Sequence, residues 1–128
     1  REALVLAHVD AENRHDVDAT VATFGSPRYE VNGQPVDGAE GVRALLDGLF
    51  TAFPDLHIEQ RAIHHADDAV IAEGRVTATH LGPFGGIEAT GRPVDYPIVG
   101  IFQFEGDELM CERVHVDTAT ILTQIGAL

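Results

Sequence analysis

The chain has 128 residues, 45% of them hydrophobic, enough for one domain that buries roughly two thirds of its unfolded surface, so we expect a single domain over residues 1–128. Its 21 acidic residues against 8 basic ones, all arginine, give a net charge of −13. That balance argues against nucleic acid and anionic membranes as partners, because both require a basic surface. No apolar run reaches the roughly 18 residues that a membrane span needs, and the one cysteine, Cys111, allows no internal disulfide, so we expect a cytoplasmic protein.

The first third of the chain predicts two helices and a short strand. Residues 2–14 form a helix with a stripe of valine and leucine on one side. His8 lies near the edge of that stripe, so it is either partly exposed or a candidate pocket residue. Asp16 is the predicted N-cap of a short second helix, and residues 28–31 are predicted as a short strand.

A third helix is the clearest local feature. It starts at the capping-box-like string Asp37-Gly38-Ala39-Glu40, and apolar residues then recur at spacings of three and four up to Pro54. This pattern predicts one broad buried face. Phe50 and Phe53 on that face are candidate residues for binding an apolar ligand.

From residue 56 onward the apolar period changes to two, which predicts an antiparallel sheet of strands near 56–62, 69–80, 97–105 and 109–117. Gly74 in the middle of a strand suggests a bulge that bends the sheet. The adjacent histidines at 64 and 65 fall in a predicted turn, where neighbouring side chains rarely converge on one ion, so no metal site is expected. The glycine-rich loop 81–92 lacks the lysine and following helix of a phosphate-binding loop.

The last strand carries an unusual polar row. Arg113, His115 and Asp117 share one face by alternation, and Gln103 on the preceding strand is expected to face them across the hairpin. The row is either a solvated face or the lining of a cavity. Asp117 is likewise either the N-cap of a final short helix over 118–124 or a functional carboxylate.

These elements together predict an α+β fold in which a curved antiparallel sheet wraps around the amino-terminal helices. A bent sheet around a Leu/Phe helix makes a cone with an apolar interior and an open mouth. Such a cone favours a small apolar organic ligand.

Several strings in the second half of the chain resemble the SnoaL-like polyketide cyclases, whose cystatin-like fold is shared by ketosteroid isomerase and nuclear transport factor 2. The strings are Phe53-Pro54-Asp55-Leu56, residues 79–86, residues 90–94, and Asp117 followed by residues 122–126. The resemblance implies a homodimer formed through the outer sheet face, no cofactor, and Asp117 as general acid and base in an intramolecular aldol ring closure. A histidine expected on the preceding strand is replaced by Gln103, which can hold a carbonyl oxygen but cannot exchange a proton near neutral pH.

The resulting expectation is a cofactor-free lyase or isomerase of polyketide-type metabolism that acts on an apolar carbonyl substrate. Its catalytic group is Asp117, whose pKa an apolar enclosure would raise. Substrate-binding roles are expected for Arg113 and His115, and His80 either anchors the glycine-rich loop or gates the mouth. Two alternatives stay open: an epoxide hydrolase, which needs a pocket arginine flanked by two carboxylates, and a non-catalytic module that binds an apolar ligand or a partner protein.

Overall fold

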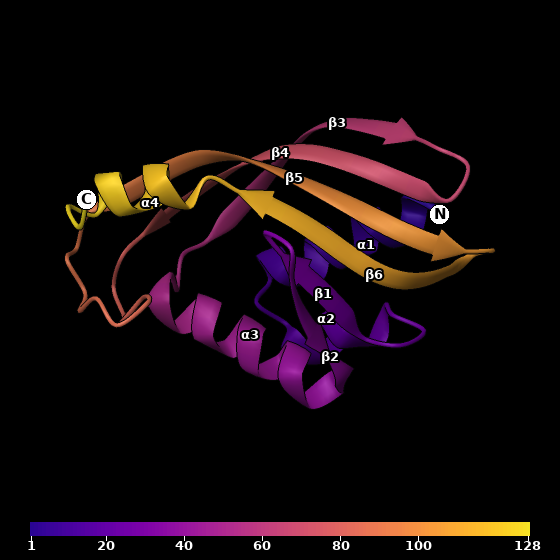
Figure 1. Cartoon of the computed structure of the whole chain (residues 1–128), viewed down its shortest axis with the longest axis horizontal. Helices are drawn as coiled ribbons and strands as arrows, with labels where there is room; N and C mark the ends of the chain where they lie inside the picture. Colours follow the sequence, from indigo (N-terminus) through magenta and orange to yellow (C-terminus); the bar gives the residue numbers. More distant parts are fainter.

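Four helices and six strands follow one another in the computed structural model, which describes residues 1–128 (Figure 1). The helices are α1 (Glu2–Asn13), α2 (Val17–Ala22), α3 (Gly38–Ala52) and α4 (Thr118–Gln124). The strands are β1 (Arg28–Val31), β2 (Gln34–Asp37), β3 (His57–His65), β4 (Ala69–Thr79), β5 (Pro93–Glu105) and β6 (Glu108–Val116). No helix is both long enough and apolar enough to cross a membrane.

All six strands form one sheet in the order β2-β1-β6-β5-β4-β3. Neighbouring strands are antiparallel except β1 and β6, which run parallel. Figure 1 shows the long strands β4, β5 and β6 arching over α3, with α4 at one end of the sheet and the N-terminus at the other. The predicted α+β cone is confirmed.

The bend in the sheet has a local cause at Gly74. In β3 the pairing with β4 slips between Gln60 and Ala62, so that Arg61 is an extra residue in a β-bulge opposite Gly74. A Cβ atom on Gly74 would lie only 2.8 Å from the Glu59 carbonyl oxygen. A bend or bulge was predicted at Gly74; the bulge lies in β3, opposite Gly74, and only glycine at this position lets the two backbones approach so closely.

Two apolar clusters hold the helices against the sheet. One joins α1 and α2 to β5 and β6 and includes Phe102 and Leu109, and the other joins the end of α3 to α4 and includes Phe53 and Ile125. Each fully buried side chain of this kind stabilises the fold by about 1.5–3 kcal/mol. Residues from both clusters line the cavity described below.

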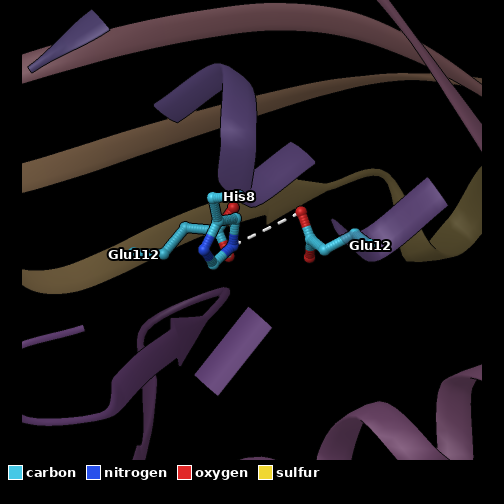
Figure 2. Close-up of side chains that lie close together, drawn as sticks. All are labelled: His8, Glu12 and Glu112. Carbon is cyan, nitrogen blue, oxygen red and sulfur yellow. Dashed lines mark ion pairs between the residues drawn. The ribbon is translucent and has the colours of Figure 1, made fainter. Parts of the chain in front are cut away.

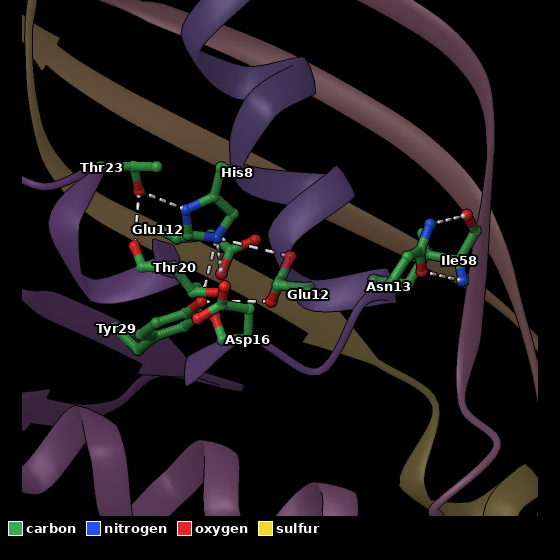
Figure 3. Close-up of polar contacts among 9 residues, drawn as sticks. All are labelled: His8, Glu12, Asn13, Asp16, Thr20, Thr23, Tyr29, Ile58 and Glu112. Carbon is green, nitrogen blue, oxygen red and sulfur yellow. Dashed lines mark hydrogen bonds and ion pairs between the residues drawn. The ribbon is translucent and has the colours of Figure 1, made fainter. Parts of the chain in front are cut away.

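The C-terminal end of α1 is fastened to edge strand β3 by the side chain of Asn13. Its Nδ2 donates to the Ile58 carbonyl at 2.9 Å, and its Oδ1 accepts from the Ile58 amide at 2.7 Å. Both bonds appear in Figure 3. The Asn13 side chain thereby pairs with the backbone of the edge strand as a neighbouring strand would. This contact fixes the position of the preceding residue, Glu12.

Some boundaries differ from those expected. The short strand β2 was not predicted, because Pro35 weakens the strand pattern, although proline is tolerated on an edge strand. The predicted capping box does not form, since the Asp37 carboxylate instead accepts from Arg28 at 2.5 Å. Strand β5 begins at Pro93, four residues before the predicted start at Pro97, where residues 93–96 already pair with β4.

Candidate active site

A cavity of about 490 Å³ lies among α3, the sheet and the loop between β4 and β5. Of its 23 lining residues 17 are hydrophobic, which favours an apolar ligand over water. The prediction that Phe50 and Phe53 face an apolar hollow is confirmed: Phe50 of α3 and Phe53, directly after α3, both line the cavity, and Phe84 lines it from the loop. The lining contains no arginine and no histidine.

Three ionisable side chains from three elements meet at one place in this apolar wall: Glu12 of α1, Tyr29 of β1 and Glu112 of β6. Tyr29 and Glu112 are partners in the register of the parallel β1–β6 pair, so their side chains lie beside each other on the same face of the sheet. The side chains of Glu12 and Glu112 are only 9% and 8% exposed. Their remaining surface contributes to the lining of the cavity.

His8 lies behind these groups, one helical turn before Glu12, and is fully buried. Its Nε2 is 3.0 Å from the Tyr29 hydroxyl, 3.4 Å from Glu12 Oε1 and 3.7 Å from Glu112 Oε2. The Tyr29 hydroxyl donates to Glu12 Oε2 at 3.1 Å. Figure 2 shows the imidazole ring in front of the Glu112 carboxylate, with the Glu12 carboxylate to one side. His8 does not itself line the cavity.

The other ring nitrogen of His8 is held by the C-cap residue of α2. His8 Nδ1 lies 2.7 Å from the Thr23 hydroxyl, and that hydroxyl donates to the Thr20 carbonyl oxygen at 2.7 Å (Figure 3). The rings of Phe24 and Phe102 contact the imidazole edge-on, with centroids 5.3 and 5.2 Å away. The ring is therefore fixed in orientation on every side.

Burial and charge shift the proton affinities of this cluster. Burial, and next the charge of Glu12, raise the pKa of the Glu112 carboxyl above its usual range despite the attraction of His8. Burial by itself lowers the pKa of His8, but the neighbouring Glu12 and Glu112 carboxylates outweigh it and raise that pKa to about 10. Burial also raises the pKa of Tyr29 well above its usual range. At neutral pH the cluster therefore holds a charged imidazolium beside a carboxyl group that protonates readily.

The spacing of these groups also decides whether they could hold a metal ion. Ligating atoms of His8, Glu12 and Glu112 lie within 4.8 Å of one another. However, the hydrogen bond between Nε2 and Tyr29 uses the position on the ring that a metal ion would need. The arrangement is therefore suited to binding and transferring a proton, and not to binding a metal ion.

The prediction that Asp117 faces an apolar cavity is wrong. Its carboxylate is exposed and caps α4, accepting from the Thr120 amide at 3.0 Å and from the Thr120 hydroxyl at 2.6 Å. These hydrogen bonds lower its pKa, the opposite of the expected rise. Asp117 therefore takes the capping role that the sequence also allowed.

The rest of the polar row lies on the outer face of the sheet. Because Glu112, Val114 and Val116 line the cavity, alternation sends Arg113 and His115 to the opposite face. Gln103 pairs with Cys111 between the buried Phe102 and Phe104, so it too faces outward. Their predicted contact with substrate in the cavity is wrong, and the arginine that an epoxide hydrolase would need is not in the lining.

His80 is also outside the cavity. It is fully buried, and its Nδ1 accepts from the Thr90 amide at 3.2 Å and contacts the Thr90 hydroxyl at 2.9 Å. Its ring packs on Phe53 with centroids 5.7 Å apart. Of the two roles considered, this geometry is that of an anchor for the loop between β4 and β5.

Two signals in the sequence could have located the cluster. His8 and Glu12 are four residues apart on a helix, on the same side as the apolar Val5 and Val9, so both polar groups should be buried. Glu112 alternates with Val114 and Val116 and is the only charged residue in an otherwise apolar row. An isolated acid in a buried row is more informative than several charges in an exposed one.

Comparison with protein-family models identifies one family. The family model of the SnoaL-like polyketide cyclases matches residues 2–125. AclR, a proposed hydroxylase from Streptomyces galilaeus, is 30% identical, with a TM-score of 0.86, covering 99% of this chain and 81% of that chain. A SnoaL-like polyketide cyclase from Agrobacterium tumefaciens is 26% identical, with a TM-score of 0.76, covering 96% and 95%.

One more distant structure bears on the fold alone. A protein with a ketosteroid isomerase-like fold from Catenulispora acidiphila is 17% identical, with a TM-score of 0.83, covering 98% of this chain and 93% of that chain. No curated protein matches the sequence.

Proposed function

The chain belongs to the SnoaL-like polyketide cyclase family, and we propose that it is a cofactor-free enzyme that enolises an apolar carbonyl compound, the step that aldol cyclisation and isomerisation share. Glu112 is the proposed general base. Glu12 and Tyr29 form the acidic side of the site, which supplies a hydrogen to the carbonyl oxygen. This assignment replaces Asp117 by a carboxylate that borders the cavity.

The observation that carries the proposal is the burial of the Glu112 carboxylate beside the cavity, with few hydrogen-bond partners. It is 8% exposed and lines an apolar cavity, and its nearest charged partner, His8 Nε2, is 3.7 Å away, beyond a good hydrogen bond. A carboxylate with few hydrogen bonds in an apolar place has a raised pKa and is a stronger base than one in water. Its lone pairs are available to a substrate.

The chemistry follows from the positions of the two carboxylates. Glu112 takes a proton from the carbon next to the carbonyl, the electrons of that C–H bond form the C=C bond of an enol, and the carbonyl oxygen receives a proton from the side of Glu12 and Tyr29. Proton transfer by a positioned group contributes on the order of a hundredfold to ten-thousandfold. The apolar wall orients the substrate and excludes water. The absence of water strengthens the hydrogen bonds that the substrate makes to Glu112 and to the side of Glu12 and Tyr29.

Hydrogen exchange tests this step without knowledge of the natural substrate. We expect the protein to accelerate the replacement of the α-hydrogens of 2-tetralone, a bicyclic ketone, by deuterium in D₂O, as followed by NMR. Glu112→Gln keeps the size of the side chain but removes the base, so the protein-dependent rate should fall at least about a hundredfold. Asp117→Asn is the matched control, because asparagine also caps helices well, and its rate should equal that of the wild type.

Three results would contradict the proposal. Equal rates in Glu112→Gln and the wild type would remove Glu112 from the chemistry. A loss of exchange in Asp117→Asn with the fold intact would return the role to Asp117. Saturable binding of the ketone without any exchange would favour the non-catalytic binding module.

A further inference from the structure

We propose that His8, Tyr29 and Glu12 form a proton relay that holds one transferable proton and delivers it to the cavity at Glu12, with Thr23 as the residue that positions His8 for this task. The inference rests on the proposed function, in which this side of the site acts as the acid. It adds two residues, His8 and Thr23, that do not touch the substrate.

The first step is a count of hydrogens at Nδ1 of His8. The Thr23 hydroxyl has a single hydrogen and lies 2.7 Å from the Thr20 carbonyl oxygen, which can only accept. That hydrogen is therefore used, and the hydroxyl must accept in its 2.7 Å contact with Nδ1. Nδ1 consequently carries a hydrogen, and Nε2 is the nitrogen whose protonation can change.

The second step counts the hydrogens along the hydrogen-bonded path from His8 through Tyr29 to Glu12. Two contacts lie on it: Nε2 to the Tyr29 hydroxyl at 3.0 Å and that hydroxyl to Glu12 Oε2 at 3.1 Å. Each hydrogen bond needs one hydrogen, and the tyrosine supplies only one. The second belongs either to Nε2, giving an imidazolium beside a carboxylate, or to Glu12, giving a neutral ring beside a carboxylic acid.

The two arrangements contain the same number of protons and differ only in position. In the transfer, the Nε2–H bond breaks as a Tyr29 O–H bond forms, and the original Tyr29 O–H bond breaks as a Glu12 O–H bond forms. The proton then passes from Glu12 to the carbonyl oxygen while Glu112 removes the proton from carbon. Return of both protons as the enol collapses to product restores the starting state.

Burial gives the relay a direction. His8 is fully buried and cannot exchange with a ligand, whereas Glu12 and Tyr29 line the cavity. The charged or titratable groups that face the ring are Glu12 of α1, Tyr29 of β1 and Glu112 of β6, and the other neighbours are Thr23 and the rings of Phe24 and Phe102. The two carboxylates beside the ring hold the stored proton inside the cluster until Glu12 delivers it.

Histidine side-chain NMR on ¹⁵N-labelled protein tests the relay directly. We expect both ring nitrogens of His8 to carry hydrogens in the free protein at about pH 8, with the six other histidines in the same spectrum for comparison. Thr23→Val removes the acceptor for Nδ1–H, so the pH at which His8 loses its charge should fall by at least about one unit. Thr23→Ser keeps the hydroxyl and should leave that pH unchanged, a rescue that loss of packing alone would not produce.

The exchange assay supplies the second readout. Tyr29→Phe keeps the ring but interrupts the relay, so α-hydrogen exchange of 2-tetralone should slow by at least about tenfold while binding of the ketone is retained. His8 carrying one hydrogen in the wild type, or equal His8 behaviour in Thr23→Val and Thr23→Ser, overturns the relay even if Glu112-dependent exchange is intact. A doubly protonated His8 in a wild-type protein that shows no exchange overturns the proposed function, and with it the use of the relay.

Discussion

The charge on His8 depends on the groups that surround it. A buried imidazolium without partners would lose its proton, because burial disfavours the charged form. The carboxylates of Glu12 and Glu112 lie 3.4 and 3.7 Å from Nε2 and reverse that preference. Burial, and next the charge of Glu12, raise the pKa of Glu112, so protonation of that carboxylate is favoured as well.

This charge makes the stability of the protein depend on alkaline pH. The pKa of His8 is raised from 6.5 to about 10 on folding. The stabilisation is therefore fully present below about pH 6.5 and is lost as the pH rises through about 10, because the native state then no longer binds the extra proton. At about 1.4 kcal/mol per unit of pKa the loss is at most a few kcal/mol. Urea unfolding midpoints at about pH 6, 8 and 10 should fall in that order.

The matched variants are again the two substitutions at Thr23. Thr23→Ser should retain the decline with pH, and Thr23→Val should make it smaller, since the valine no longer accepts from Nδ1. The pKa of Asp55 is lowered by its hydrogen bonds with Thr79, so its contribution is present above its unfolded pKa and disappears only as the pH falls through the folded value. A wild-type midpoint that is constant between about pH 6 and 10 would contradict a charged His8.

At the scale of elements, strand β6 shows how much of the site can be predicted from the sequence. Its alternation divides the side chains correctly into two rows, but alternation alone does not say which row faces the cavity. The row with Arg113 and His115 has more functional groups, yet the row with Glu112 is inside. The side is set by the parallel pairing of β1 with β6, which places Tyr29 beside Glu112. That contact joins residues far apart in the chain, and local patterns carry no information about it.

The loop after β4 offers a second prediction at this scale. The amides of Leu81 and Gly82 both donate to the Ala52 carbonyl at the end of α3, at 3.0 and 3.1 Å. A Cβ atom on Gly82 would lie 2.2 Å from the Thr51 carbonyl oxygen, where neither backbone can move freely. Gly82→Ala should therefore destabilise the fold by about 1–3 kcal/mol in urea unfolding.

Gly48 in the middle of α3 is the matched control for that substitution. A Cβ atom at Gly48 meets nothing within 4 Å. Because alanine is favoured over glycine by up to about 1 kcal/mol inside a helix, Gly48→Ala should stabilise the protein. The close approach at Gly82 would be contradicted if both substitutions changed stability by the same amount and in the same direction.

At the scale of the molecule, the fold was far more predictable than the site. The apolar periods of 3.6 and 2 fix helices and strands locally, and the switch between them at residue 56 marks the start of the four long strands β3 to β6. The cavity arises from how far α3 lies from the sheet and from the bend at Gly74, which are properties of packing. The Phe50 and Phe53 side chains could be placed in it because they continue the apolar face of the strongly amphipathic α3, Phe50 within the helix and Phe53 as its C-cap residue.

The outer face of the sheet carries the last prediction, a homodimer, which the family resemblance implies. Ile71, Ile101 and Arg113 are partners in register across β4, β5 and β6 and form a half-exposed stripe on that face. The Nε atom of Arg113 is buried on that face without a hydrogen-bond partner. Light scattering should give about twice the chain mass of 13.8 kDa. Ile101→Glu adds a charge to the stripe of a protein at −13 and should yield the monomer, whereas a wild-type mass of one chain would overturn the dimer.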